Sequence, residues 1–141
     1  MQSIRFKETF RERMPEWVVS AGMLGWGLLA IFALGLFQRL DLFHPLLLVM
    51  PQLKWGIIAA TTGLIRIIFL IINGAWRPSA HVRAIGCGLG CMLWGSLAVS
   101  SLQLHWLITT TALYVTLLAL DFFSLGFAAG DAKLADLAAK G

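Results

Sequence analysis

The stretch "GLIRIIFLIINGAWRPSAHVRAIG", residues 63–86, contains the features that decide the fold. An apolar run with a single arginine, Arg66, leads into a short polar loop, after which the chain turns apolar again. A helix needs about 20 mainly apolar residues to cross the hydrocarbon core of a bilayer. Pro78 in the loop prevents one helix from running straight through. The stretch therefore predicts two membrane-spanning helices joined by a tight turn.

The composition of the whole chain also indicates a membrane protein. Hydrophobic residues make up 59% of the 141 residues and charged residues 13%, against about 45–50% and about 25% in soluble domains. So few charges could not cover that much apolar surface in water. The net charge of +4 is not gathered on one basic face, which argues against nucleic acid as a partner.

Four apolar runs are long enough to cross a membrane as helices. They cover residues 17–37, 53–76, 82–102 and 106–129. We therefore expect an all-α fold, a four-transmembrane-helix bundle whose membrane domain is residues 17–129. The first run is longer than the apolar core of a signal peptide, so it is predicted to be retained as a span.

The segments outside the spans are predicted to lie at the membrane surface. Residues 1–16 place apolar side chains at helical spacing beside charged ones, which predicts a short amphipathic helix on the cytoplasmic side. Residues 38–52 contain two prolines and too few apolar residues to cross, so an interfacial or re-entrant segment is expected over about 42–52. Gly130 is a predicted helix stop, and residues 130–141 are expected to form a cytoplasmic tail.

Lysine and arginine are concentrated on one predicted side of the membrane. Eight of them lie in the N-terminal segment, the loop after the second span and the C-terminal tail, against Arg39 and Lys54 on the other side. The positive-inside rule then places both termini in the cytoplasm, in a multi-pass protein of the bacterial inner membrane. Four tryptophans at predicted span ends are expected to anchor the helices at the interface: Trp17, Trp55, Trp76 and Trp106.

Arg66 and Asp121 are the two charged residues deep inside the predicted spans. With cytoplasmic termini they lie roughly 10 and 12 Å from the cytoplasmic border, at about 1.5 Å of rise per residue. A charge at such a depth costs about 2.5–3.5 kcal/mol on insertion scales, which favours a partner of opposite sign. We therefore predict an intramembrane ion pair between Arg66 and Asp121.

Other polar residues share helix faces with these charges and form a predicted polar seam: Thr62, Asn73, Thr110, Tyr114 and Ser124. The two faces could satisfy each other by hydrogen bonding, or they could line a small hydrated cavity. Three roles stay open for the charges: an internal clasp, a proton or ion path, and a contact with a partner protein or another copy. Arg66 could instead extend toward the cytoplasmic headgroups.

Small residues at intervals of four predict close helix packing, because they let backbones approach where lipid supplies no hydrophobic drive. The pairs are Gly86 with Gly90, Ala84 with Gly88, and Ala21 with Gly25. Packing within one molecule and dimerisation are both compatible with this pattern. Cys87 and Cys91 lie on the same face of the third span and are interpreted as small buried residues.

The loop between the second and third spans carries a family resemblance. The fragments "KWG" at 54–56, "GLIR" at 63–66 and "NGAWRPSAHVR" at 73–83 resemble small multi-pass membrane proteins encoded in phages and prophages of alphaproteobacteria. The resemblance covers about residues 45–102, and Ser79 is followed by alanine where that pattern has proline. It implies a viral or integrated origin and no particular chemistry. From the residues alone, Arg77 and Arg83 are expected to meet anionic headgroups.

Motifs of enzymes are missing from the sequence, including nucleophile elbows, phosphate-binding loops and zinc-binding helices. We therefore expect a non-enzymatic protein without cofactor or metal. Its expected partners are the lipid bilayer and either a second copy or a host membrane protein. We expect the protein to act by membrane insertion or perturbation, in the manner of a holin. Two alternatives stay open: a superinfection-exclusion or accessory protein that binds a host membrane protein, and a small ion- or proton-conducting oligomer.

Overall fold

The computed structural model describes residues 13–75, 80–103 and 108–138. Over these ranges the chain is helical, with short turns and no strand. Four long helices are apolar enough to cross a membrane: α2 (Met14–Phe32), α5 (Gln52–Ala75), α6 (Ala80–Leu102) and α7 (Ile108–Ala138). Three short helices lie between α2 and α5: α3 (Leu36–Arg39), the 3-10 helix η1 (Asp41–Phe43) and α4 (His44–Val49). The all-α prediction with four candidate spans is confirmed.

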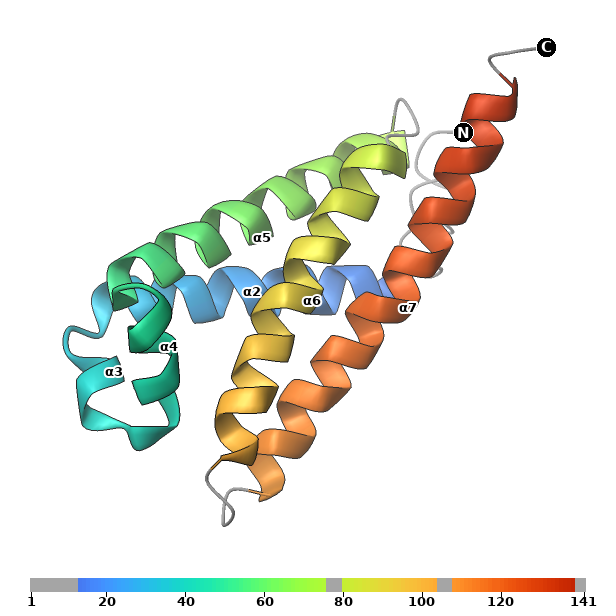
Figure 1. Ribbon diagram of the computed structural model, residues 1–141. Coiled ribbons are helices and arrows are strands. Elements are labelled where there is room, and N and C mark those ends of the chain that lie inside the picture. The colour runs from blue at the N-terminus through green and yellow to red at the C-terminus, as the bar shows by residue number, and fades with distance from the viewer. Residues whose placement is uncertain (1–12, 76–79, 104–107, 139–141) are drawn as a thin grey trace.

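The four long helices pack as two pairs. Helix α2 lies along α5 and helix α6 lies along α7, whereas contacts between the pairs are sparser. Figure 1 shows the α2–α5 pair crossing the α6–α7 hairpin, with α3 and α4 beside the start of α5. Helix α6 also contacts η1 and α4. The residues of functional interest lie where the two pairs meet.

Small residues hold α2 and α5 together. A Cβ atom on Gly27 of α2 would collide with the backbone of Ala60, and one on Gly63 of α5 would lie 2.5 Å from the backbone nitrogen of Leu24. A Cβ on Gly56 would meet the side chain of Ile31 at 2.8 Å. Backbones approach this closely only where side chains are missing, which is the way small residues drive helix association in lipid.

Ala21 and Gly25 do not form the packing surface of the first span within one molecule. Both residues are exposed, and a Cβ on Gly25 would have no described atom within 4 Å. The contact is made instead by the face that contains Gly27. The sequence analysis considered only small residues four positions apart, whereas Gly56 and Gly63 on the facing helix are seven residues apart.

The first span ends earlier than its apolar run suggests. Helix α2 stops at Phe32 instead of residue 37, and Gly35 adopts a left-handed conformation, with φ of 74°, that reverses the chain. The Gln52 side chain stabilises this end: its Nε2 donates to the carbonyls of Ala30 and Ala33 at 2.7 and 2.8 Å. Its Oε1 accepts from the backbone nitrogen of Phe37 at 2.9 Å. One amide therefore satisfies groups that a helix end leaves without partners.

The segment after this turn folds back onto the protein core. Phe37 and Phe43 are buried and stack with ring centroids 4.6 Å apart. The indole nitrogen of Trp55, at the start of α5, donates to the Leu46 carbonyl at 3.0 Å. The interface-anchor prediction for Trp55 is therefore wrong, because its ring is buried against α4 and satisfied by protein.

The remaining boundaries follow the predicted spans except at the C-terminal end. Helices α5 and α6 cover the expected second and third spans within two residues at each end. Helix α7 continues through Gly130 to Ala138, so the predicted helix stop is wrong. Buried Ala132 and the Asp131 carboxylate, which pairs with α6, hold the extra turns in place. Residues 1–12, Trp76, Arg77 and Trp106 lie outside the described part of the chain.

Candidate functional site: buried charges and an apolar groove

The predicted ion pair between Arg66 and Asp121 is present. Arg66 Nη2 lies 2.5 Å from Asp121 Oδ1, and Arg66 Nη1 donates to Asp121 Oδ2 at 3.1 Å. The two residues are 6% and 0% exposed. Such a two-point contact fixes the planes of both groups as well as joining opposite charges. The Asp121 carboxylate is thus held by α5 although it belongs to α7.

Two glycines of α6 make room for this pair. Helices α5 and α7 scarcely touch, because α6 lies between them. A Cβ on Gly86 would lie 2.8 Å from Arg66 Cγ, and one on Gly90 would overlap the Asp121 carboxylate and lie 2.7 Å from Arg66 Nη1. The arginine stem therefore passes over α6 at Gly86, and its head meets the aspartate at Gly90. The predicted small-residue pair is present, but it accommodates side chains instead of a helix backbone.

Sulfur atoms surround the rest of the Arg66 guanidinium. Its Nη2 donates to Cys87 Sγ at 3.5 Å, and its Nη1 approaches Met23 Sδ at 3.9 Å. Sulfur is a weak acceptor, so Asp121 supplies the main stabilisation. These contacts still tie α2 and α6 to the same guanidinium. All four long helices therefore meet at Arg66.

A second buried cluster was not anticipated from the sequence. Arg83 of α6 donates through Nε and Nη2 to Glu16 of α2, at 3.0 and 2.5 Å, and through Nη1 to Asp131 of α7 at 2.9 Å. Arg83 and Glu16 are buried, whereas the Asp131 side chain is 52% exposed. The prediction that Arg83 meets lipid headgroups is wrong, since carboxylates from two helices occupy its donors.

Glu16 was missed because it was assigned to the amphipathic surface segment. The signal was nevertheless present: Glu16 follows Pro15 and lies in the first turn of the first apolar helix, where a carboxylate is stabilised by the helix dipole. Arg83 begins the third span and Asp131 ends the fourth. Three charges that share one end of the helices were candidates for an ion-pair network.

In the described part of the chain, no hydrogen bond joins one side chain of the predicted polar seam to another. Thr62, Tyr114 and Ser124 are buried, and Thr110 is half-buried. The Ser124 hydroxyl bonds to the Leu120 carbonyl of its own helix, and the Tyr114 ring stacks on Trp94 at 6.4 Å. The side chain of Asn73 lies outside the described part of the chain. Among the described residues of the two predicted faces, Arg66 and Asp121 are the pair whose side chains bond to each other.

A small cavity separates the two charge clusters. Its volume is about 10 Å³, and its lining includes Glu16, Arg66, Arg83 and Cys87. That is room for about one water molecule, for which four polar groups would be available. The larger groove described below has no charged residue in its lining, although Met23, which contacts Arg66, lines it as well. The charges are therefore packed against protein instead of lining an aqueous path.

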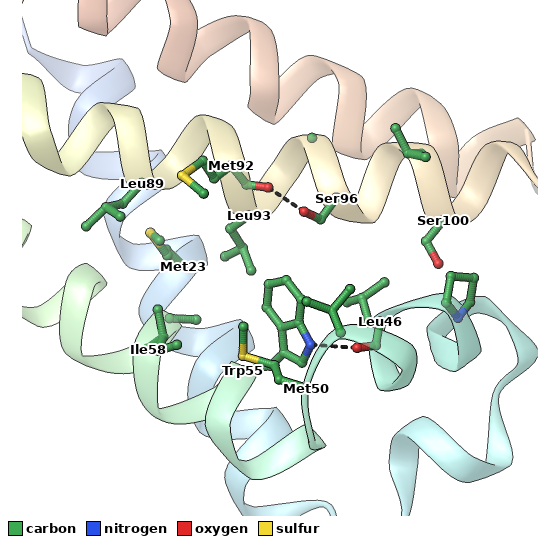
Figure 2. A pocket seen from close by; sticks show the side chains of 15 residues that line it. Met23, Leu46, Met50, Trp55, Ile58, Leu89, Met92, Leu93, Ser96 and Ser100 are labelled. Atoms are coloured by element: carbon green, nitrogen blue, oxygen red, sulfur yellow. Dashed lines mark hydrogen bonds between the residues drawn. The ribbon is translucent and has the colours of Figure 1, made fainter.

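A larger, apolar cavity lies on the other side of Met23. A groove of about 600 Å³ runs between α6 on one side and α4 and α5 on the other, with Met23 of α2 at its floor. Figure 2 shows Trp55 and Leu93 projecting into it and Met92 and Leu89 along its α6 edge. Two hydroxyl groups, on Ser96 and Ser100, are the polar side chains that line it. The groove therefore suits hydrocarbon.

The remaining predicted small residues make no close helix contact, and the two cysteines form no disulfide. A Cβ on Gly88 would have no described atom within 4 Å, and Ala84 is half-buried. Cys87 and Cys91 are free thiols. Among the described residues, no group of three histidine, cysteine, aspartate or glutamate side chains could hold a metal ion.

Comparison with protein-family models, with curated proteins and with solved structures finds no match for this chain.

Proposed function

We propose that the protein is a non-enzymatic, multi-pass protein of the bacterial inner membrane, of phage or prophage origin, that acts by binding a partner within the bilayer. A superinfection-exclusion or accessory role fits this description. The observation that carries the proposal is that the buried charges of both clusters are paired within the chain. Arg66, Arg83, Glu16 and Asp121 each pair with another residue of the same chain. None of the four is left to attract ions.

An ion-conducting role receives less support from the same geometry. Conduction needs a polar path across the membrane, lined by charged or carbonyl groups. Beside the charges there is room for about one water molecule. A conducting oligomer would have to open both clusters, and breaking a buried ion pair costs about 3–5 kcal/mol.

A holin-like lesion also receives less support than a binding role. A hydrated lesion needs polar side chains on the faces that would line it. Outward-facing positions of α7 carry large apolar side chains, including Phe122, Phe123 and Phe127. These faces suit lipid or an apolar partner surface.

The proposed topology keeps both termini in the cytoplasm. Arg13 and the cluster of Glu16, Arg83 and Asp131 lie at one end of the helices, whereas Arg39 and Lys54 lie at the end formed by α3 and the start of α5. With Lys133 of α7, the first end carries three of the described basic residues against two at the other end, which supports this orientation.

The test is to express the protein in a bacterial host, follow membrane potential with a voltage-sensitive dye, and measure the plating efficiency of related phages. We expect an unchanged potential and reduced plating. The matched control is Asp121→Asn, which keeps the side-chain shape but removes the charge. Depolarisation by the native protein would overturn the binding role. Depolarisation that Asp121→Asn abolishes, at an amount of membrane-inserted protein equal to the native, would indicate conduction. Depolarisation that the variant leaves unchanged would indicate a holin-like lesion.

A further inference from the structure

We propose that the apolar groove between α4, α5 and α6 is a binding site for one acyl chain of an anionic phospholipid. The lipid would come from the leaflet that contains α3 and α4. Nothing in the partner-binding role described above requires this site, and either can fail without the other. The lipid assignment rests on the length of the groove, its chemistry and the charges at one end.

The size of the groove fits one chain from one leaflet. Its volume of about 600 Å³ falls within the range of about 300–1,000 Å³ typical of ligand sites. Along α6 its lining extends from Leu89 to Ser100, about 16 Å at roughly 1.5 Å per residue. Half of the hydrocarbon core is about 15 Å. A transmembrane partner helix would need an apolar face along the whole span, twice this length.

The lining offers hydrocarbon contact and few polar donors. Met23, Met50 and Met92 contribute flexible, polarisable side chains that adapt to an irregular ligand. The Ser96 hydroxyl donates to the Met92 carbonyl at 2.7 Å, and the Ser100 hydroxyl donates to the Leu42 carbonyl. The Trp55 indole N–H is also used internally, by Leu46. A ligand with polar groups along its length would therefore find no free donor.

Basic residues mark the end of the groove where a phosphate would lie. Lys54 precedes the groove residue Trp55, and Arg39 ends α3, which contacts the α4 wall of the groove. Among the described residues neither makes an ion pair, whereas the single acid of this region, Asp41, lies 3.7 Å from His44. Juxtamembrane lysine and arginine attract anionic lipid headgroups by about 1 kcal/mol each. An anionic phospholipid matches both parts of the site, with its acyl chain in the apolar groove and its phosphate at the basic residues.

The groove can be tested by photo-crosslinking in proteoliposomes. The probe is phosphatidylglycerol with a diazirine on its acyl chain, and labelled peptides of the full-length protein are identified by mass spectrometry. We expect labels on groove residues such as Leu89, Met92 and Met50 in preference to Phe122 and Phe127, which face outward from α7. Equal labelling of both sets would overturn the site, since it would mean annular lipid only. An unlabelled groove would overturn it as well, as expected if a second copy covers that face.

A groove-filling variant and a matched control sharpen the test. Ser96→Phe places a ring in the groove, whereas Thr116→Phe places one on the exposed face of α7. Both native hydroxyls donate to the carbonyl four residues earlier, at 2.7 and 2.8 Å. We expect Ser96→Phe to lower groove labelling about tenfold, or about 1.4 kcal/mol, and Thr116→Phe to leave it unchanged. Undiminished labelling in Ser96→Phe would contradict the site.

A second variant guards against misfolding, and a second lipid tests the headgroup. Val99→Trp adds bulk at a groove residue that is 58% exposed, where the helix can accept it, and it should also reduce labelling. Phosphatidylcholine with the same diazirine chain should label the groove less than phosphatidylglycerol, and Lys54→Gln should narrow that difference. Equal labelling by the two lipids would overturn the assignment of an anionic phospholipid.

Discussion

Gly90 of α6 lies directly against the carboxylate of Asp121 on α7, so closely that a Cβ on the glycine would overlap Asp121 Oδ2. The same absent side chain leaves space for the Arg66 guanidinium. One glycine thus allows an arginine from α5 to reach an aspartate across the width of α6. The buried pair and the small-residue motif, which look independent in the sequence, are parts of one arrangement.

Gly90→Ala should therefore destabilise the protein more than a glycine-to-alanine change normally does. The added methyl group must displace Asp121 or Arg66, and overpacking costs about 1–3 kcal/mol. Unfolding in a mild detergent, followed by circular dichroism with increasing denaturant, measures the loss. Gly88→Ala is the control, since its Cβ would have no described atom within 4 Å. That variant should gain up to about 1 kcal/mol from helix propensity, and equal losses in both variants would contradict the arrangement.

The ion pair between Arg66 and Asp121 should behave as a unit. Removing one partner leaves an uncompensated buried charge and should cost about 3–5 kcal/mol, whereas replacing both with apolar residues is often neutral. We expect Arg66→Met and Asp121→Leu each to lower the free energy of unfolding strongly. The double variant should recover most of the loss, because methionine keeps the stem that passes Gly86. A double variant as unstable as the worse single variant would exclude a structural clasp.

Sequence reasoning found this pair because its cost in the membrane is unusual. Two opposite charges at the same depth in a membrane usually pair with each other, so hydropathy and helix geometry alone predicted the Arg66–Asp121 contact. The arrangement of the helices around this contact could not be predicted in the same way. The sequence pattern suggested that spans two and four face each other, whereas α6 lies between them. Which helices are neighbours depends on many weak packing contacts that no short motif encodes.

In the second cluster, Glu16 and Asp131 should contribute unequally to the free energy of unfolding. Glu16 is buried and accepts two hydrogen bonds from Arg83, whereas the Asp131 side chain is 52% exposed. We expect Glu16→Ala to cost several-fold more than Asp131→Ala, since exposed pairs contribute about 0–1 kcal/mol. Denaturant unfolding of both variants and of Arg83→Lys provides the comparison. Lysine cannot make the two-point contact, so a fully stable Arg83→Lys would contradict the geometry.

The ends of the helices were the least predictable part of the fold. The apolar run through Phe37 gave no sign that the helix would stop at Phe32, because Leu34, Leu36 and Phe37 are as apolar as the helix itself. The stop depends on Gly35 and on a glutamine seventeen residues later. Gly130 shows the reverse case: glycine often ends helices, but α7 continues through it, with buried Ala128 and Ala132 on either side.

Gln52 stabilises the C-terminal end of α2, and its replacement should destabilise mainly the turn that follows this helix. Its side chain makes three hydrogen bonds, to the carbonyls of Ala30 and Ala33 and from the amide of Phe37. Each buried bond contributes about 0.5–1.5 kcal/mol. Gln52→Ala should therefore lower the free energy of unfolding by about 2–4 kcal/mol.

The loss should appear first as faster hydrogen exchange of amides in residues 33–40, measured by mass spectrometry in detergent. Gln38→Ala is the matched control, because Gln38 is exposed and surface changes of this kind stay within about 0.5 kcal/mol. Gln52→Glu separates the two functions of the amide. It keeps the acceptor for Phe37 but replaces two donors with a buried negative charge facing two carbonyls. It should therefore destabilise the turn at least as much as alanine does, and protection equal to the native protein would show that the helix end does not depend on this side chain.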